Sequence, residues 1–137
     1  MRVLALDHGS KRIGVAISDE LRMIAQPLEF IPAHPPEAAL RRLQAIIQEK
    51  NVSVILVGMP RNMDGTYGPA AEKAKVFVET LRQALAVPIK TWDERLTTVQ
   101  ANRFLSGANV RGSKRKEKVD QTAAAILLQS YLDSANP

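Results

Sequence analysis

Separated carboxylates are the side chains of this sequence best placed to do chemistry. Asp7 ends the apolar stretch VLAL, Asp93 and Glu94 end the stretch PIKTWDE, and Asp120 opens an apolar helical pattern. Acidic groups that converge without a counter-ion repel one another and raise each other's pKa. A hard divalent cation removes this conflict, and all-oxygen ligation favours Mg²⁺ or Mn²⁺ over zinc. The sequence therefore predicts a divalent-metal site, if these carboxylates meet in the fold.

Such a site is suited to phosphodiester hydrolysis. Two divalent ions about 4 Å apart can activate a water and stabilise the leaving oxygen of a phosphodiester. The net charge of +5 favours a polyanionic partner such as nucleic acid. The side chains that we expect to contact its backbone are Lys11, Arg12, Arg61, Asn62, Arg95, Arg111, Lys114, Arg115, Lys116 and Lys118. Many of these lie in VRGSKRKEK, directly before Asp120, although such a charge run is also typical of a solvated loop.

Each carboxylate also has a purely structural interpretation. Asp7 precedes a glycine-containing turn, where an aspartate commonly accepts backbone hydrogen bonds. Successive side chains of a strand point to opposite faces, so only one of Asp93 and Glu94 can share a face with Asp7. The spacing alone does not choose between them.

Asp120 is the least expected of the acidic residues. On a helix it would share an arc with Ala123, Ala124, Leu127 and Tyr131, the face that packs on a sheet. A charge there costs several kcal/mol unless it is paired or bound to metal. A metal site, an ion pair with Lys11 or Arg12, and a first-turn position that reaches solvent all remain open.

The elements that would position these residues follow from hydrophobic periodicity. We expect strands at 2–6, 12–18, about 27–31, 52–58 and 88–94, and helices that start near Pro36 and Pro69, after Thr97 or Thr98, and at about 118–133. The run 3–6 is typical of a central strand, and Pro27 and Pro32 indicate an edge strand. DHGSKR is expected as a turn, 58–69 as a glycine-rich connection and 106–118 as a loop. This order, a three-strand meander followed by alternating helices and strands, predicts an α/β fold with a five-stranded mixed sheet covered on both faces.

Composition restricts the class of protein. The 137 residues are expected to form one domain, 1–137, with 45% hydrophobic residues to build a core. The absence of cysteine excludes disulfides, thiolate metal sites and a cysteine nucleophile. Charged residues within the first twenty positions and short apolar runs argue against a signal peptide or membrane span. We therefore expect a soluble, cytoplasmic protein without membrane partners.

Four motifs also resemble a known family. DHGSKRIGVAISD, VGMPRNMDGTYGP, DERLTT and KVDQTAAAILL resemble, in this order, motifs of the YqgF family, whose members are described as pre-16S rRNA nucleases or Holliday junction resolvases. The resemblance spans nearly the full chain and implies the RNase H-like fold, with Asp7, Glu94 and Asp120 as catalytic and metal-binding residues. It thereby selects Glu94 over Asp93. A metal-binding Asp7 would also gain from the rigid end of a central strand.

The leading functional prediction is a metal-dependent endonuclease that acts on structured nucleic acid. The resemblance favours 5′-end processing of pre-16S rRNA in ribosome biogenesis over cleavage of branched DNA. Junction resolution requires two sites and hence a dimer, whereas the sequence indicates a monomer or weak homodimer. The alternatives are a nucleotide-binding module, for which the chain lacks a second domain, and a non-catalytic RNA-binding ribosome-assembly factor.

Overall fold

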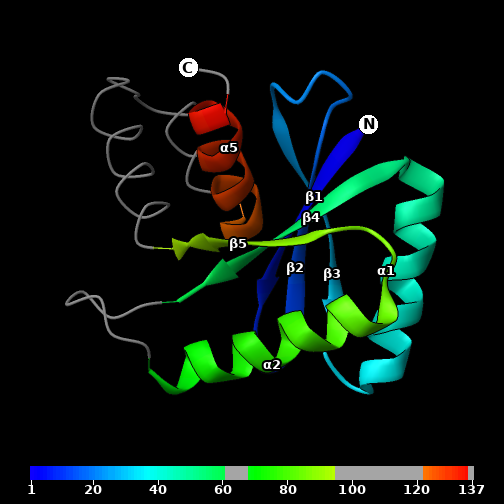
Figure 1. Cartoon of the computed structure of the whole chain (residues 1–137), viewed down its shortest axis with the longest axis vertical. Helices are drawn as coiled ribbons and strands as arrows, with labels where there is room; N and C mark the ends of the chain where they lie inside the picture. The colour runs from blue at the N-terminus through cyan, green and yellow to red at the C-terminus, as the bar shows by residue number, and fades with distance from the viewer. Residues whose placement is uncertain (61–67, 95–121, 136–137) are drawn as a thin grey trace, which may run out of the picture.

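A five-stranded sheet with helices on both faces forms the body of the protein. The structure is a computed structural model that describes residues 1–60, 68–94 and 122–135 (Figure 1). Its elements are β1 (Arg2–His8), β2 (Arg12–Ser18), β3 (Ala25–Pro32), α1 (Pro36–Lys50), β4 (Val52–Met59), α2 (Pro69–Ala84), β5 (Ile89–Asp93) and α5 (Ala123–Ala135). The helix expected after Thr97 or Thr98 and the loop expected at 106–118 lie outside the described residues.

The strand order is β3-β2-β1-β4-β5, which confirms the predicted mixed sheet. β1, β2 and β3 form the antiparallel meander, while β1, β4 and β5 run parallel. β1 is central and its apolar run is fully buried, and the proline-containing β3 lies at an edge, both as predicted. Because β1, β4 and β5 are parallel, their carboxyl ends meet at one edge of the sheet, where open α/β sheets place ligands.

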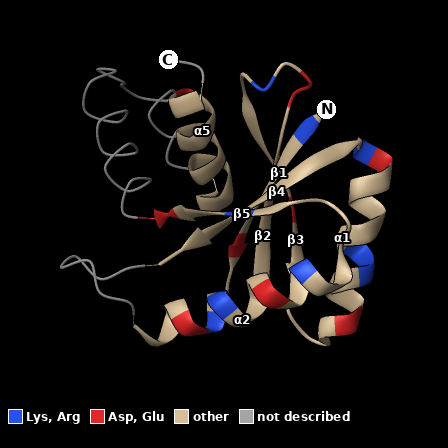
Figure 2. Cartoon of the chain, viewed as in Figure 1, with Lys and Arg blue, Asp and Glu red and all other residues tan. Residues whose placement is uncertain are grey.

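Two hydrophobic layers lie on opposite faces of the sheet. Side chains alternate along each strand, so that Leu4 and Leu6 of β1 join the layer beneath α1 and α2. Val3 and Ala5 join the layer beneath α5. Figure 1 shows α5 apart from α1 and α2, and Figure 2 shows that charged residues gather along α1 and α2 but are sparse on the strands. Within the described residues, the helices are too short or too polar to span a membrane.

The first hairpin is tighter than predicted. β1 continues through Asp7 and His8, since these residues pair with Gly14 and Ile13 of β2. The expected turn DHGSKR is therefore wrong at its first two residues. The backbone N–H of Gly9 donates to the carbonyl of Arg12 at 3.0 Å and closes the hairpin. Asp7 consequently lies within the rigid part of a central strand.

The final helix also begins later than predicted. α5 starts at Ala123 instead of about residue 118, because the Thr122 hydroxyl accepts a hydrogen bond from the backbone N–H of Ala125 and caps the helix. Ala124 and Leu127 are buried as predicted, but Ala123 is exposed. Asp120 lies outside the described residues, so its predicted place on the buried arc remains a prediction.

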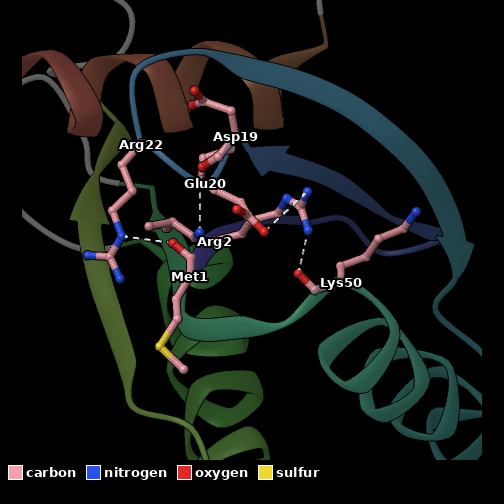
Figure 3. A network of polar contacts seen from close by, with 8 residues as sticks. Met1, Arg2, Asp19, Glu20, Arg22 and Lys50 are labelled. Carbon is pink, nitrogen blue, oxygen red and sulfur yellow. Dashed lines mark hydrogen bonds and ion pairs between the residues drawn. The ribbon is translucent and has the colours of Figure 1, made fainter.

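A polar network lies at the amino end of β1 (Figure 3), whereas Asp7 lies near the carboxyl end of the same strand. The Arg2 guanidinium donates to the carbonyl of Lys50 at 2.9 Å and lies 4.0 Å from a Glu20 carboxylate oxygen. The Arg22 side chain donates to the carbonyl of Met1 at 3.2 Å. These contacts join the β2–β3 loop, the start of β1 and the end of α1, and so stabilise the edge away from the carboxylates.

Candidate active site

Asp7 faces α5 from the carboxyl end of the central strand. Its side chain follows Val3 and Ala5 in the alternation of β1, both of which pack under α5. Gly14, its partner on β2, confirms this direction, since a Cβ on Gly14 would lie 3.6 Å from the Asp7 Cβ and 3.7 Å from the Ala124 Cβ. Asp7 therefore lies beside the first turn of α5.

Glu94 reaches the same face from β5. Trp92 packs into the layer beneath α5, and Glu94 follows two residues later, directly after the strand ends at Asp93. Gly58 of β4 makes room for the Glu94 side chain, because a Cβ there would lie 2.6 Å from Glu94 Oε1. The same added Cβ would lie 3.0 Å from Leu127 Cδ1 of α5. Glu94 is thus held between the end of β4 and the buried face of α5.

Asp7 and Glu94 interact directly. Burial, followed by the negative charge of Asp7 and a hydrogen bond with it, raises the pKa of Glu94 from 4.5 to about 7, and Asp93 adds a smaller contribution in the same direction. A hydrogen bond between two carboxyl groups requires a proton on one of them, so the Glu94 carboxyl donates to Asp7. The two carboxyl groups therefore share one proton, and a divalent cation bound by both would take its place.

The geometry supplies a physical reason to prefer Glu94 over Asp93. By strand alternation, Asp93 points to the face that carries α1 and α2, whereas Glu94 points toward α5. The choice depends on which face each residue occupies, and the sequence carried no local signal for it. The resemblance to the YqgF family selects Glu94, and Glu94 is the residue that the structure brings to Asp7.

The other predicted site residues divide into two groups. Lys11, on the β1–β2 turn, and Arg12, the first residue of β2, are exposed at the same edge of the sheet as Asp7. The remaining predicted residues lie outside the described ones: Arg61, Asn62, Arg95, Arg111, Lys114, Arg115, Lys116, Lys118 and Asp120. Among the residues described, no three acidic, histidine or cysteine side chains form a group that could hold a metal.

The two facing carboxylates fit a divalent cation. Together they offer oxygen ligands from two strand ends, which is the donor chemistry that Mg²⁺ and Mn²⁺ prefer. The raised pKa of Glu94 reflects partial burial beside a second acid, a situation that a cation would relieve. Asp7 and Glu94 are the residues that would hold such an ion.

A separate pocket of about 420 Å³ lies on the opposite face, between α1 and α2. His8 lines this pocket and stacks on Phe77 with ring centroids 4.3 Å apart. Burial lowers the pKa of His8. Since Asp7 and His8 are consecutive residues of one strand and face opposite ways, this pocket is not continuous with the carboxylate site.

Sequence reasoning missed two residues that shape the site. Gly58 was predicted only as the junction between a strand and a glycine-rich connection, and Phe30 only as part of an edge strand. Phe30 approaches the site from β3, where its Cε1 would lie 3.5 Å from a Cβ on Gly14. A glycine within an apolar strand could have indicated Gly58, since such a position often marks the close approach of another group. No local signal identified Phe30.

A sequence model of a known family covers almost the whole chain. The family is described as "RuvX: Holliday junction resolvase", and the match spans residues 1–134. The chain belongs to the RuvX family. This membership confirms the resemblance inferred from the motifs, because RuvX and YqgF denote the same family.

Relatives of this chain share about half of its residues over nearly its full length. A protein of Halothermothrix orenii named "Putative pre-16S rRNA nuclease" is 49% identical over 136 residues, which cover 99% of this chain and 97% of the relative. A protein of Desulforamulus reducens with the same name is 51% identical over 134 residues, 98% of each chain.

Solved structures confirm the RNase H-like fold predicted for this chain. RuvC of T. thermophilus, in complex with a Holliday junction substrate, superimposes with a TM-score of 0.56 at 15% identity, over 99% of this chain and 95% of RuvC. The Fowlpox virus resolvase, in complex with Holliday junction DNA, superimposes with a TM-score of 0.54 at 14% identity over 100% of both chains. At such low identity the likeness carries the fold alone.

Proposed function

We propose that this chain is a divalent-metal-dependent endonuclease that hydrolyses phosphodiester bonds in structured nucleic acid, with pre-16S rRNA as its substrate. The observation that carries the proposal is the pairing of Asp7 and Glu94 at the carboxyl edge of the sheet, where the Glu94 pKa is raised to about 7. The names of the relatives support RNA processing as the purpose of this chemistry. Processing of rRNA precursors would place the protein in the cytoplasm.

Asp7 and Glu94 would act together on the phosphodiester. Their oxygens would hold a divalent cation, which would supply the charge that activates water and stabilises the leaving oxygen. Asp7, on the central strand, would provide a rigid ligand, and Glu94 would have to lose its proton to bind the ion. We propose Asp120 as the third carboxylate, because it precedes Thr122, which caps the helix beside Asp7.

Basic side chains would hold the nucleic-acid backbone near these carboxylates. Lys11 and Arg12 are exposed at the edge where Asp7 lies. The other predicted contacts, which lie outside the described residues, are Arg61, Asn62, Arg95, Arg111, Lys114, Arg115, Lys116 and Lys118. Contacts of this kind orient a substrate without reading its sequence, and their strength falls as salt rises.

Branched DNA is the second candidate substrate, because the family is described as a Holliday junction resolvase. Resolution of a junction requires symmetric cleavage by two copies, and hence a dimer. A monomer or weak homodimer, which we propose for this chain, fits cleavage of a single RNA strand better.

A cleavage assay tests the proposal. Wild type, Asp7→Asn and Asp93→Asn would each be incubated with a pre-16S rRNA 5′-leader fragment and with a four-way DNA junction, in Mg²⁺, in Mn²⁺ and in EDTA. Asp93→Asn is the matched control, since it removes a neighbouring carboxylate on the opposite face of the sheet. We expect metal-dependent cutting of the RNA that Asp7→Asn abolishes and Asp93→Asn retains.

The other outcomes are equally decisive. Cutting of the junction alone would replace RNA with branched DNA as the substrate. Cutting that survives in Asp7→Asn would refute the assignment of the site. Absence of cutting, together with RNA binding that Asp7→Asn leaves unchanged, would instead identify a non-catalytic ribosome-assembly factor.

A further inference from the structure

Phe30 lies in one row with the candidate catalytic aspartate. Asp7 of β1 pairs with Gly14 of β2, and Gly14 pairs with Phe30 of β3. Neighbouring strands are about 4.8 Å apart, so two strand spacings place the Phe30 backbone roughly 10 Å from that of Asp7. Residues that pair in register point to the same face of a sheet, so Phe30 and Asp7 both face the side that α5 covers.

Gly14 lies between these two side chains and adds no side chain of its own. A Cβ on Gly14 would be in van der Waals contact with Phe30 Cε1 at 3.5 Å, with the Asp7 Cβ at 3.6 Å and with the Ala124 Cβ of α5 at 3.7 Å. Gly58 leaves a gap on the other side of Asp7, which Glu94 fills. Phe30, on the edge strand β3, is therefore the exposed end of the row that contains Asp7.

The Phe30 ring is not used to build the core. It is 47% exposed and belongs to neither hydrophobic layer, although it lies on the face that α5 packs against. The Arg12 guanidinium lies over this ring, 3.9 Å from its centroid. An exposed aromatic ring paired with an exposed guanidinium plane presents two surfaces on which a flat group can stack.

We propose that the Phe30–Arg12 pair is a stacking subsite for an unpaired nucleobase next to the scissile phosphate. The proposal rests on the proposed nuclease function and specifies the substrate further, as a nucleic acid with an unstacked base at the cleavage position. Proteins hold single-stranded nucleic acid by stacking bases on aromatic rings and guanidinium planes. Arg12 adds a positive charge for the adjoining phosphate, which the Phe30 ring alone lacks.

Binding measured without divalent metal tests the subsite separately from catalysis. The probes are a fluorescent single-stranded oligoadenylate and an abasic ribose-phosphate chain of the same length, both in EDTA. The variants are Phe30→Ala, Phe30→Tyr, Arg12→Lys and, as the control, Leu21→Ala. Leu21 is an 80% exposed apolar residue on the β2–β3 loop at the far edge of the sheet.

We expect Phe30→Ala to weaken oligoadenylate binding about 10-fold, the usual consequence of losing one stacked base. Phe30→Tyr, which retains the ring, should bind like wild type, and Leu21→Ala should also bind like wild type. Arg12→Lys keeps the charge but loses the guanidinium plane, so it should weaken oligoadenylate binding more than abasic binding. None of the Phe30 variants should affect binding of the abasic chain.

Several results would overturn the subsite. Equal binding of oligoadenylate by wild type and Phe30→Ala would exclude a stacking role for Phe30. Equal weakening of both probes would show that Phe30 acts without contacting a base. A change of oligomeric state in Phe30→Ala, seen by light scattering, would instead identify an interface between two copies. Because these measurements need no cleavage, they can fail while the nuclease assignment stands, and the reverse.

Discussion

Glu94 is expected to make the metal-free protein less stable as the pH rises from about 4.5 through about 7. Burial first, and then Asp7, raise the pKa of Glu94 from 4.5 to about 7 in the folded chain. Between these values the folded state holds a proton that the unfolded state has lost. The stabilisation is therefore complete below about pH 4.5 and is lost as the pH rises through about 7.

The size of the effect follows from the same two pKa values. A change from 4.5 to about 7 corresponds to at most ~3 kcal/mol in the free energy of unfolding. Because the Glu94 carboxyl is only partly buried, screening by water reduces the expected loss to ~1–2 kcal/mol. Glu94→Gln keeps a neutral side chain of the same shape, so it should be more stable than wild type above about pH 7 by that amount.

Urea unfolding in EDTA measures this difference. Trp92 is the only tryptophan and lies beside Glu94 on β5, so its fluorescence reports on the site. Glu49→Gln, which removes an exposed carboxylate at the end of α1, is the matched control and should keep the pH dependence of wild type. Added Mg²⁺ should restore stability at high pH in wild type but not in Glu94→Gln. An identical pH dependence in wild type and Glu94→Gln would refute the reasoning.

Two further predictions concern residues that shape or support the site. Gly58→Ala should displace Glu94, since the new Cβ would lie 2.6 Å from its Oε1, and should reduce cleavage by about 100-fold. Gly14→Ala is the control, because its new Cβ would meet contacts of 3.5 Å or more. Thermal unfolding of both variants should show that Gly58→Ala loses activity while it stays folded. Ser18→Ala removes the buried hydroxyl that accepts from the backbone N–H of Val3 at 2.9 Å, and should lower the free energy of unfolding by ~1–3 kcal/mol in a urea titration. A loss below the error of that titration would contradict the last prediction.

Local patterns were sufficient to predict most of the scaffold. The continuous apolar run at 3–6 correctly predicted a central strand, and Pro27 and Pro32 correctly predicted an edge strand. Pro36 and Pro69 each occupy the first turn of a helix, as expected. These features depend on backbone geometry and side-chain periodicity within a few residues, which the sequence displays directly.

The ends of the elements were less predictable. β1 extends past Leu6 because its last residues pair with β2, and α5 starts at Ala123 because Thr122 caps it. Both boundaries depend on hydrogen bonds that a hydrophobic pattern does not contain.

The sequence by itself determined which acidic residues were available and which strand ends would carry them. The family resemblance had selected Glu94 over Asp93, but only the tertiary structure showed the physical reason, because that reason depends on which face of β5 lies beneath α5. The tertiary structure also decided that Gly58 makes room for Glu94 and that Phe30 lies in register with Asp7. These relations join residues that are distant along the chain, and the contacts between separate strands that create them exist only once the sheet has formed.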